Sequence, residues 1–139
     1  MKLTKEQIKS IADDLDCGMI VYVHKETKEI KTIIDFDSHL DVDMELWKED
    51  INEIEENFDM YFQFELMDSR KSFQIMEDFT ESIVDDELRK KLELGLRLSK
   101  PFRNFKDIID YEDEYRDKWF EFKSAKYVEF VNEHLSLFN

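Results

Sequence analysis

The fold is decided by the stretch MIVYVHKETKEIKTIIDF, residues 19–36. Its first part, residues 19–24, consists mainly of strand-forming residue types, and residues 29–36 alternate through Ile30, Thr32 and Ile34. The polar residues between them, 25–28, are typical of a hairpin loop of four or five residues. The stretch therefore predicts two antiparallel strands that lie side by side in one sheet.

We expect a helix before this hairpin, and a helix and a third strand after it. Thr4 and Gln7 form a capping-box pattern, and the helix that they begin ends at Gly18. Its buried face carries Ile8, Ile11, Ala12 and Leu15. A second helix is predicted to bury a stripe of Trp47, Ile51, Ile54 and Phe58. Residues 60–66 alternate with a period of two, which predicts the third strand.

From Asp68 onward the apolar residues recur at helical spacing. One predicted helix carries Phe73, Met76, Phe79 and Ile83. The next helix begins after Asp85 and carries Leu88, Leu92, Gly95 and Leu96. A third helix begins at Pro101 and carries Phe102, Phe105, Ile108 and Ile109. The whole chain has only two glycines and one proline, too few for a turn-rich β architecture. We therefore predict one α+β domain, residues 1–139, with an N-terminal helix, a small antiparallel sheet of about three strands and a helical C-terminal half.

Composition excludes several classes of protein. The 139 residues include 42% apolar residues and 19 aromatics, enough to build a core. Cys17 is the only cysteine, which excludes an intrachain disulfide and a cysteine-based zinc site. The first residues lack the apolar segment of a signal peptide, and no run has the length of a membrane span. We expect a cytoplasmic protein that does not contact a membrane.

Charge is unevenly distributed along the chain. The 35 acidic and 20 basic residues give a net charge of −15, of which −10 lies in residues 35–59. Residues 89–106 carry +6 instead, so Arg97, Lys100, Arg103 and Lys106 are candidate contacts for phosphate or nucleic acid. The alternative is that these bases pair with the acidic segment of the same chain, or are simply solvated.

A ladder of aromatic residues, Tyr111, Tyr115, Trp119 and Phe122, fits one buried helical face. The run of residues 119–122 widens that face, so one ring is expected at the surface. Trp119 and Phe120 are therefore the candidate contacts for a protein partner.

No metal, cofactor or catalytic site is predicted. Residues 35–43 place a possible ligand at every second position, but a calcium loop needs glycine and glutamate where this chain has Leu40 and Leu46. His24, His39 and His134 are far apart in the sequence, and none has a motif partner. Cys17, beside Asp16, is expected to be a small buried residue at a helix end.

Four segments together resemble a bacterial family known as uncharacterised protein family 0158. They are residues 22–29, 75–79, 101–107 and 119–122, of which Phe102-Arg103-Asn104-Phe105-Lys106-Asp107 is the most specific. The chain departs from the family pattern at Lys28, where the family has glycine, and at Asn104, where it has arginine. The resemblance implies one shared fold and no known activity.

The leading functional prediction is a non-enzymatic intracellular binding or regulatory module whose partner is another macromolecule, a protein. The alternative is a binder of nucleic-acid backbone or phosphate through residues 89–106, and an unrecognised enzyme is the alternative of a different class. The sequence is rich in charged and aromatic residues and contains no catalytic motif, which favours the binding module over the two alternatives. The sequence indicates no oligomeric state.

Overall fold

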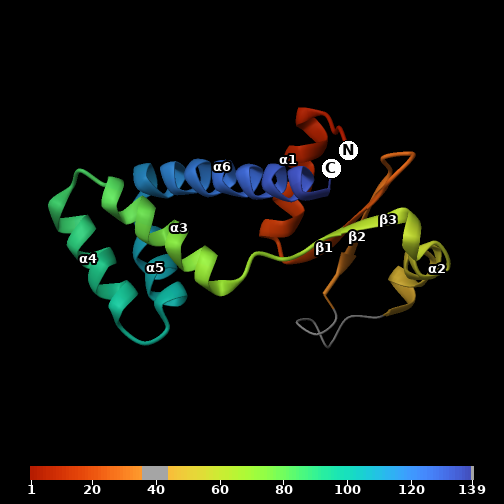
Figure 1. The fold of residues 1–139 in the computed structure, drawn as a ribbon. Helices are drawn as coiled ribbons and strands as arrows, with labels where there is room; N and C mark the ends of the chain where they lie inside the picture. Colours follow the sequence, from red (N-terminus) through yellow and green to blue (C-terminus); the bar gives the residue numbers. More distant parts are fainter. Residues whose placement is uncertain (36–43, 139) are drawn as a thin grey trace. The chain divides into compact units, whose positions relative to one another are not determined.

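The first helix, α1 (Lys5–Asp16), begins at the predicted capping box. In the computed structural model, which describes residues 1–35 and 44–138 (Figure 1), the Gln7 N–H donates to Thr4 Oγ1 at 3.1 Å. The Thr4 N–H donates to Gln7 Oε1 at 2.8 Å. Gly18 follows the helix with φ +82°, a left-handed conformation that glycine adopts without steric cost. Both predicted ends of this helix are confirmed.

Three antiparallel strands form the predicted sheet, in the order β2-β1-β3. They are β1 (Met19–His24), β2 (Ile30–Ile34) and β3 (Tyr61–Phe64), so β2 and β3 are shorter than predicted. The His24 ring closes the hairpin loop, because its Nδ1 accepts from the N–H groups of Glu26 and Thr27 at 3.1 Å each. Lys28 occupies the left-handed region in this loop with φ 66°, at the position where glycine was expected from the family pattern.

Helices cover both faces of this sheet. On one face Val21, Val23 and Phe64 pack against α1 and against the C-terminal part of α6 (Asp113–Phe138). On the other face Ile33 and Tyr61 pack against α2 (Lys48–Glu56). The alternation of side chains along a strand explains this arrangement, because neighbouring residues point to opposite faces.

Helix α2 is flanked by two short 3-10 helices, Met44–Trp47 and Phe58–Met60. Ile54 is buried and Trp47 and Ile51 are partly buried, as predicted, whereas Phe58 is 63% exposed. The prediction for Phe58 is wrong because the helix ends at Glu56, so Phe58 does not continue its apolar stripe.

An ion pair joins α2 to the sheet. Lys31 Nζ lies 3.1 Å from Asp50 Oδ1 and 3.5 Å from Glu29 Oε1, and its side chain is mostly buried. The hydrogen bond to Asp50 raises the pKa of Lys31. Burial raises the pKa of Tyr61 and of Tyr22 in the same layer. All three groups therefore hold their protons more tightly in the folded chain than in the unfolded one.

We predict a loss of stability in alkali that originates in this layer. A group whose pKa is raised on folding stabilises the folded chain. This stabilisation is fully present below the unfolded-state pKa, which is about 10 for tyrosine and lysine, and it is lost as the pH rises through the folded-state pKa. The free energy of unfolding, measured by urea titration from pH 7 to pH 11, should be constant to about pH 9 and then fall. The double variant Tyr22→Phe/Tyr61→Phe should show a shallower fall. An equally steep fall in that variant would contradict the assignment.

Four helices, or parts of helices, form a second core. Asp68 caps α3 (Ser69–Ser82), Asp85 caps α4 (Asp86–Arg97), and Pro101 starts α5 (Pro101–Ile109). All the buried residues except Ile75 belong to the predicted stripes, with Trp119 of α6 among them: Ile75, Met76, Phe79, Ile83, Leu88, Leu92, Leu96, Phe105, Ile109 and Trp119. Tyr111 is 88% exposed because it precedes α6, so the prediction that buries its ring is wrong. Phe102, on the first turn of α5, is 44% exposed.

The described chain thus has the predicted α+β fold, with its two cores in two units. We call them the sheet unit, made of residues 1–66 and the part of α6 from Tyr127, and the helical unit, Met67–Lys126. Helix α6 is continuous and supplies residues to both. Within the described ranges, no helix combines the length and apolar character that a membrane crossing demands. That residues 1–139 behave as one domain stays a prediction.

Candidate functional site

A close approach of α4 to α5 shapes the surface of the helical unit. Gly95 makes this approach possible: a Cβ there would lie 3.2 Å from Ile108 Cδ1 and 3.3 Å from Asn104 Cβ, both tight contacts. The Asn104 side chain fixes the turn between the helices, because its Nδ2 donates to the carbonyl oxygens of Gly95 and Ser99 at 2.9 Å each. Asn104, which stands where the family pattern has arginine, therefore holds the turn between α4 and α5 in place.

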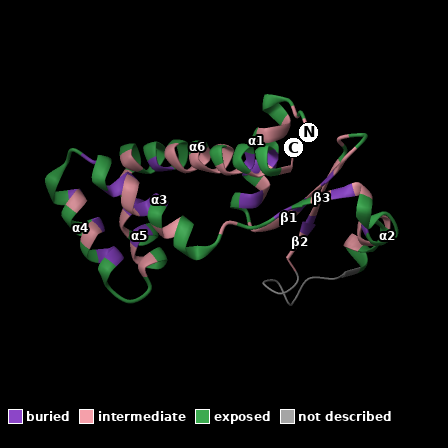
Figure 2. Cartoon of the chain, in the orientation of Figure 1, coloured by how far each residue is buried: buried purple, intermediate pink, exposed green. Residues whose placement is uncertain are grey.

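A groove of about 340 Å³ lies along these two helices, and we call it the α4–α5 groove. Its lining is mainly apolar and consists of Lys91, Leu94, Gly95, Leu98, Asn104, Asp107 and Ile108. Leu94 is 58% exposed and Leu98, the residue that follows α4, is 55% exposed. Figure 2 shows that α4 carries both buried and exposed residues along its length. These two leucines have no role in the predictions made from the sequence. A signal was present, because they are spaced by four residues and do not belong to the buried stripe of α4.

Charged residues border this groove. On α4, Lys91 pairs with Glu87 at 3.8 Å, and on α5, Arg103 pairs with Asp107 at 3.9 Å. The side chains of both pairs are exposed. Such exposed pairs contribute little stability, so a ligand can replace them at small cost. Within the described ranges, Lys90, Arg97 and Lys100 have no ion-pair partner, and all three are exposed.

The four bases predicted to bind phosphate lie on three consecutive pieces of the helical unit. Arg97 is the last residue of α4, and Lys100 precedes α5 with φ 59°. Arg103 and Lys106 lie one turn apart on α5, where Arg103 is paired with Asp107. Their role as contacts stays a prediction.

The two residues predicted to contact a protein differ in exposure. Trp119 is 8% exposed, with its ring centroid 4.8 Å from that of Phe105 and 5.3 Å from that of Phe79. Phe120 is 42% exposed and lies between the cations of Arg116 and Lys123, at 5.1 Å and 5.3 Å. The exposed ring of this pair is therefore Phe120, and Trp119 belongs to the core.

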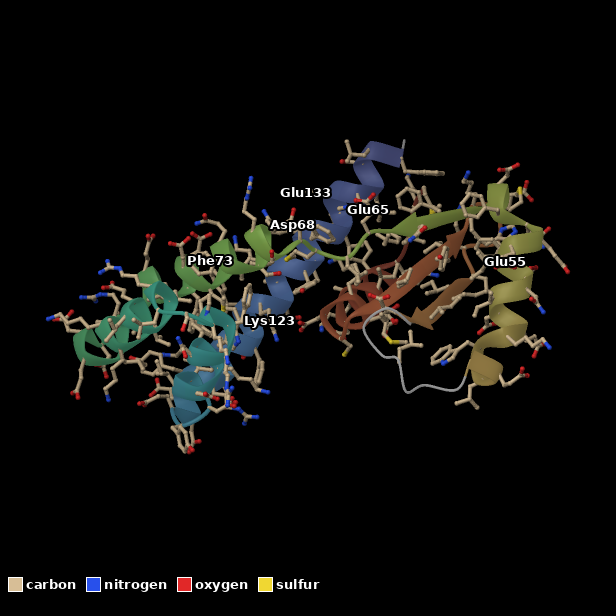
Figure 3. The ribbon with its side chains drawn as sticks, turned by 90° about the horizontal axis from the view of Figure 1, so that it is seen from below. Glu55, Glu65, Asp68, Phe73, Lys123 and Glu133 are labelled. Atoms are coloured by element: carbon tan, nitrogen blue, oxygen red, sulfur yellow. The ribbon has the colours of Figure 1, made fainter. Side chains whose placement is uncertain are left out.

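A smaller hollow of about 180 Å³ lies between α3 and α4. It is lined by Phe73, which is labelled on α3 in Figure 3, and by Glu77, Thr80, Glu81, Glu93, Leu96 and Arg97. Thr80 is buried and donates its hydroxyl to the Met76 carbonyl oxygen at 2.8 Å, so its hydrogen is already used. In the part of the chain that the structure describes, no group of three acidic, histidine or cysteine side chains is placed to hold a metal ion.

The remaining chemistry-bearing residues lie in the sheet unit. Cys17 is exposed, so the prediction of a buried residue is wrong: as the C-cap of α1 it lies beyond Leu15, the last buried residue of that helix. His134 Nδ1 lies 3.0 Å from the Phe130 carbonyl oxygen. Residues 36–43, which contain most of the candidate calcium stretch and His39, lie outside the described residues.

Comparison with known proteins gives one result over nearly the whole chain. Residues 5–138 match the model of a family described as Uncharacterised protein family (UPF0158). No curated protein and no solved structure matches the chain. The match covers the two cores, the hairpin and the α4–α5 groove, and it agrees with the resemblance seen in the four sequence segments. The chain therefore belongs to this uncharacterised family.

Proposed function

We propose that the chain is a non-enzymatic module that binds another protein through the α4–α5 groove. The observation that carries this proposal is the pair of exposed leucines, Leu94 and Leu98, placed beside Ile108 in one hollow. Burial of apolar surface contributes about 25 cal/mol for each Å² removed from water. A partner that covers both leucines would therefore gain free energy from surface that is exposed in the free chain.

The surroundings of the groove also favour a protein partner. Protein interfaces combine an apolar centre with a polar rim, and charged residues are depleted in the centre. Here the centre is formed by the leucines and Ile108, and the rim carries Lys91 and Asp107. Gly95 and the Asn104 side chain hold the two helices in place, so the groove is formed before a partner binds.

We expect the double variant Leu94→Glu/Leu98→Glu to lose at least tenfold of the protein that the wild-type chain captures from a native lysate. Two carboxylates in an apolar contact would be buried without partners, which is costly. The control is Val84→Glu, at an 88% exposed position outside the groove, which should capture as the wild type does. Circular dichroism checks that both variants are folded. Equal capture by the groove variant and the control would contradict the proposal.

The same capture tests the alternative of nucleic-acid binding, which the exposed bases Arg97, Lys100, Arg103 and Lys106 support. Partners held through nucleic acid should disappear after nuclease treatment and in the charge reversal Arg103→Glu/Lys106→Glu. If four phosphates are contacted, the logarithm of the binding constant should fall with the logarithm of salt with a slope of about −3.6. Capture that resists nuclease and depends on the leucines supports the protein partner.

A further inference from the structure

One titratable side chain closes the loop between β1 and β2, residues 25–29, at the tip of the hairpin (Figure 1). His24 is the last residue of β1, and its ring Nδ1 accepts from the N–H groups of Glu26 and Thr27 at 3.1 Å each. An imidazole nitrogen accepts a hydrogen bond only when it carries no hydrogen, so the neutral ring here has its hydrogen on Nε2. The closed loop therefore requires the neutral form of His24.

Protonation of the ring removes this acceptor. When Nδ1 takes a proton from water, the imidazolium ion carries an N–H at both ring nitrogens and accepts no hydrogen bond. Three N–H groups would then point at one another, and they repel each other at the separation of 3.1 Å. Glu26 and Thr27 are exposed, so water replaces the ring as the acceptor once the loop moves. The binding of one proton thus exchanges a closed loop for an open one.

The closed loop also holds one residue in an unfavourable backbone conformation. Lys28 has φ 66°, in the left-handed region that residues with a side chain adopt only at a cost. Its N–H donates to the His24 carbonyl oxygen at 3.0 Å, and its Nζ donates to the Lys25 carbonyl oxygen. Such a conformation persists where the surrounding contacts determine it, and the two hydrogen bonds to the ring are among those contacts. Their loss therefore favours a different conformation of the loop.

Contacts that do not use the ring hold the start of the loop. The Lys25 N–H donates to the Met60 carbonyl oxygen, and Lys25 Nζ donates to the Asp59 carbonyl oxygen, at 2.8 Å each. The ladder between β1 and β2 does not involve the ring either, because it is formed by backbone groups. The change on protonation is therefore confined to residues 26–28, and the sheet stays paired.

Other titratable groups stand near the ring, and histidine differs from them in the pH range where its charge changes. The ring packs edge-on against Tyr61 of β3, with centroids 5.1 Å apart, and burial raises the pKa of that tyrosine. The charged groups on the loop and around the Tyr61 hydroxyl are Lys25, Glu26, Lys28, Glu29, Lys31, Asp50 and Glu53. Tyrosine and lysine change charge mainly above the range of about pH 5 to 8, and carboxyl groups mainly below it. His24 is therefore the group of this cluster whose charge changes within that range.

We propose that this loop is a pH-sensitive conformational switch, which is closed while His24 is neutral and is opened by protonation of its ring. The closed form is favoured at high pH and loses stability as the pH falls, because the open form binds the additional proton more readily. The transition is expected between about pH 8 and pH 5, where histidine changes charge. The switch lies in the sheet unit and does not depend on the α4–α5 groove, which belongs to the helical unit.

Nuclear magnetic resonance of the ¹⁵N-labelled full-length chain tests the switch between pH 8 and pH 5. We expect the His24 ring to be the Nε2–H tautomer at pH 8. The amide resonances of Glu26 and Thr27 should shift with the same midpoint as the ring nitrogens of His24. The protection of these two amides from hydrogen exchange, relative to the rate of an unstructured chain at the same pH, should be at least tenfold lower at pH 5 than at pH 8.

Two variants separate the acceptor from the rest of the side chain. In His24→Asn the amide oxygen accepts from nearby backbone N–H groups, as asparagine does in turns, but it does not titrate. We expect the loop amides of this variant to keep their protection down to pH 5. In His24→Phe the ring still packs against Tyr61 but offers no acceptor, so the protection should be low already at pH 8.

Several results would overturn the proposal. Protection of Glu26 and Thr27 that stays constant with pH in the wild type would show that the loop does not respond to the ring. The same fall of protection in His24→Asn would assign the transition to another group. An Nδ1–H tautomer in the wild type at pH 8, or full protection in His24→Phe, would show that the ring is not the acceptor that closes the loop.

Discussion

Replacement of Phe105 by alanine is expected to lower the free energy of unfolding of the helical unit by about 3–5 kcal/mol. Phe105 is 2% exposed and lies at the centre of an aromatic cluster, with ring centroids 4.8 Å from Trp119 and 6.4 Å from Phe79. The variant loses the burial of the ring, leaves a cavity in a close-packed core, and removes two edge-to-face contacts. Because domains are stable by only about 5–15 kcal/mol, this loss is a large part of the total.

Urea unfolding followed by the fluorescence of Trp119 measures this loss, in a background where Trp47 is replaced by phenylalanine. The matched control is Phe102→Ala on the same helix, which makes the same chemical change at a 44% exposed ring. We expect the control to lose clearly less stability, since much of its ring is already in water. Equal losses for the two variants would show that Phe105 is not central to this core.

The second large effect is expected from Phe64→Ala in the sheet unit, also about 3–5 kcal/mol. Phe64 has no exposed surface, pairs with Val21 across the β1–β3 ladder, and packs under α1 and α6. Its ring lies 4.9 Å from that of Phe62 in an edge-to-face contact. The control Phe58→Ala changes a 63% exposed ring of the same unit and should lose much less. A wild-type urea midpoint in the Phe64 variant would contradict this assignment of the core.

These two variants also test whether residues 1–139 unfold as one domain. Each unit contains one tryptophan, Trp47 in the sheet unit and Trp119 in the helical unit. We propose a single cooperative domain because α6 supplies Trp119 to one core and Val131 to the other without a break in the helix. Phe105→Ala should then lower the urea midpoint reported by Trp47, in a Trp119→Phe background, as much as that reported by Trp119 in the Trp47→Phe background. A shift seen by Trp119 alone would mean that the two units unfold independently.

Local patterns predicted most of the secondary structure correctly. The capping residues Thr4, Asp68 and Asp85 start their helices where the sequence places them, because a side-chain acceptor for the free N–H groups is a local property. Two of the residues that were predicted wrongly, Phe58 and Tyr111, lie just outside the helix whose spacing they continue. Spacing alone does not show where a helix ends, so these two rings were assigned to cores that they do not reach.

The candidate site was predicted only in part. The excess of positive charge in residues 89–106 was visible in the sequence, and Lys91, the base that lines the groove, belongs to that segment. The leucines were not found, because an apolar residue in a helix is more often buried, and exposure depends on which face the neighbouring helices cover. The same reasoning applies to residues 119 and 120, where the sequence did not decide which ring is exposed.

By itself the sequence determined the helices, the hairpin, the family and the uneven distribution of charge, since each depends on residue types at fixed separations along the chain. Only the tertiary structure decided that Leu94, Leu98 and Ile108 share one groove. The cause is the close approach of α4 and α5 at Gly95, where the missing side chain lets two helices meet that are separated in sequence by a short turn. Contact between helices depends on the sizes of side chains on both of them, and that information is not contained in the spacing of either one.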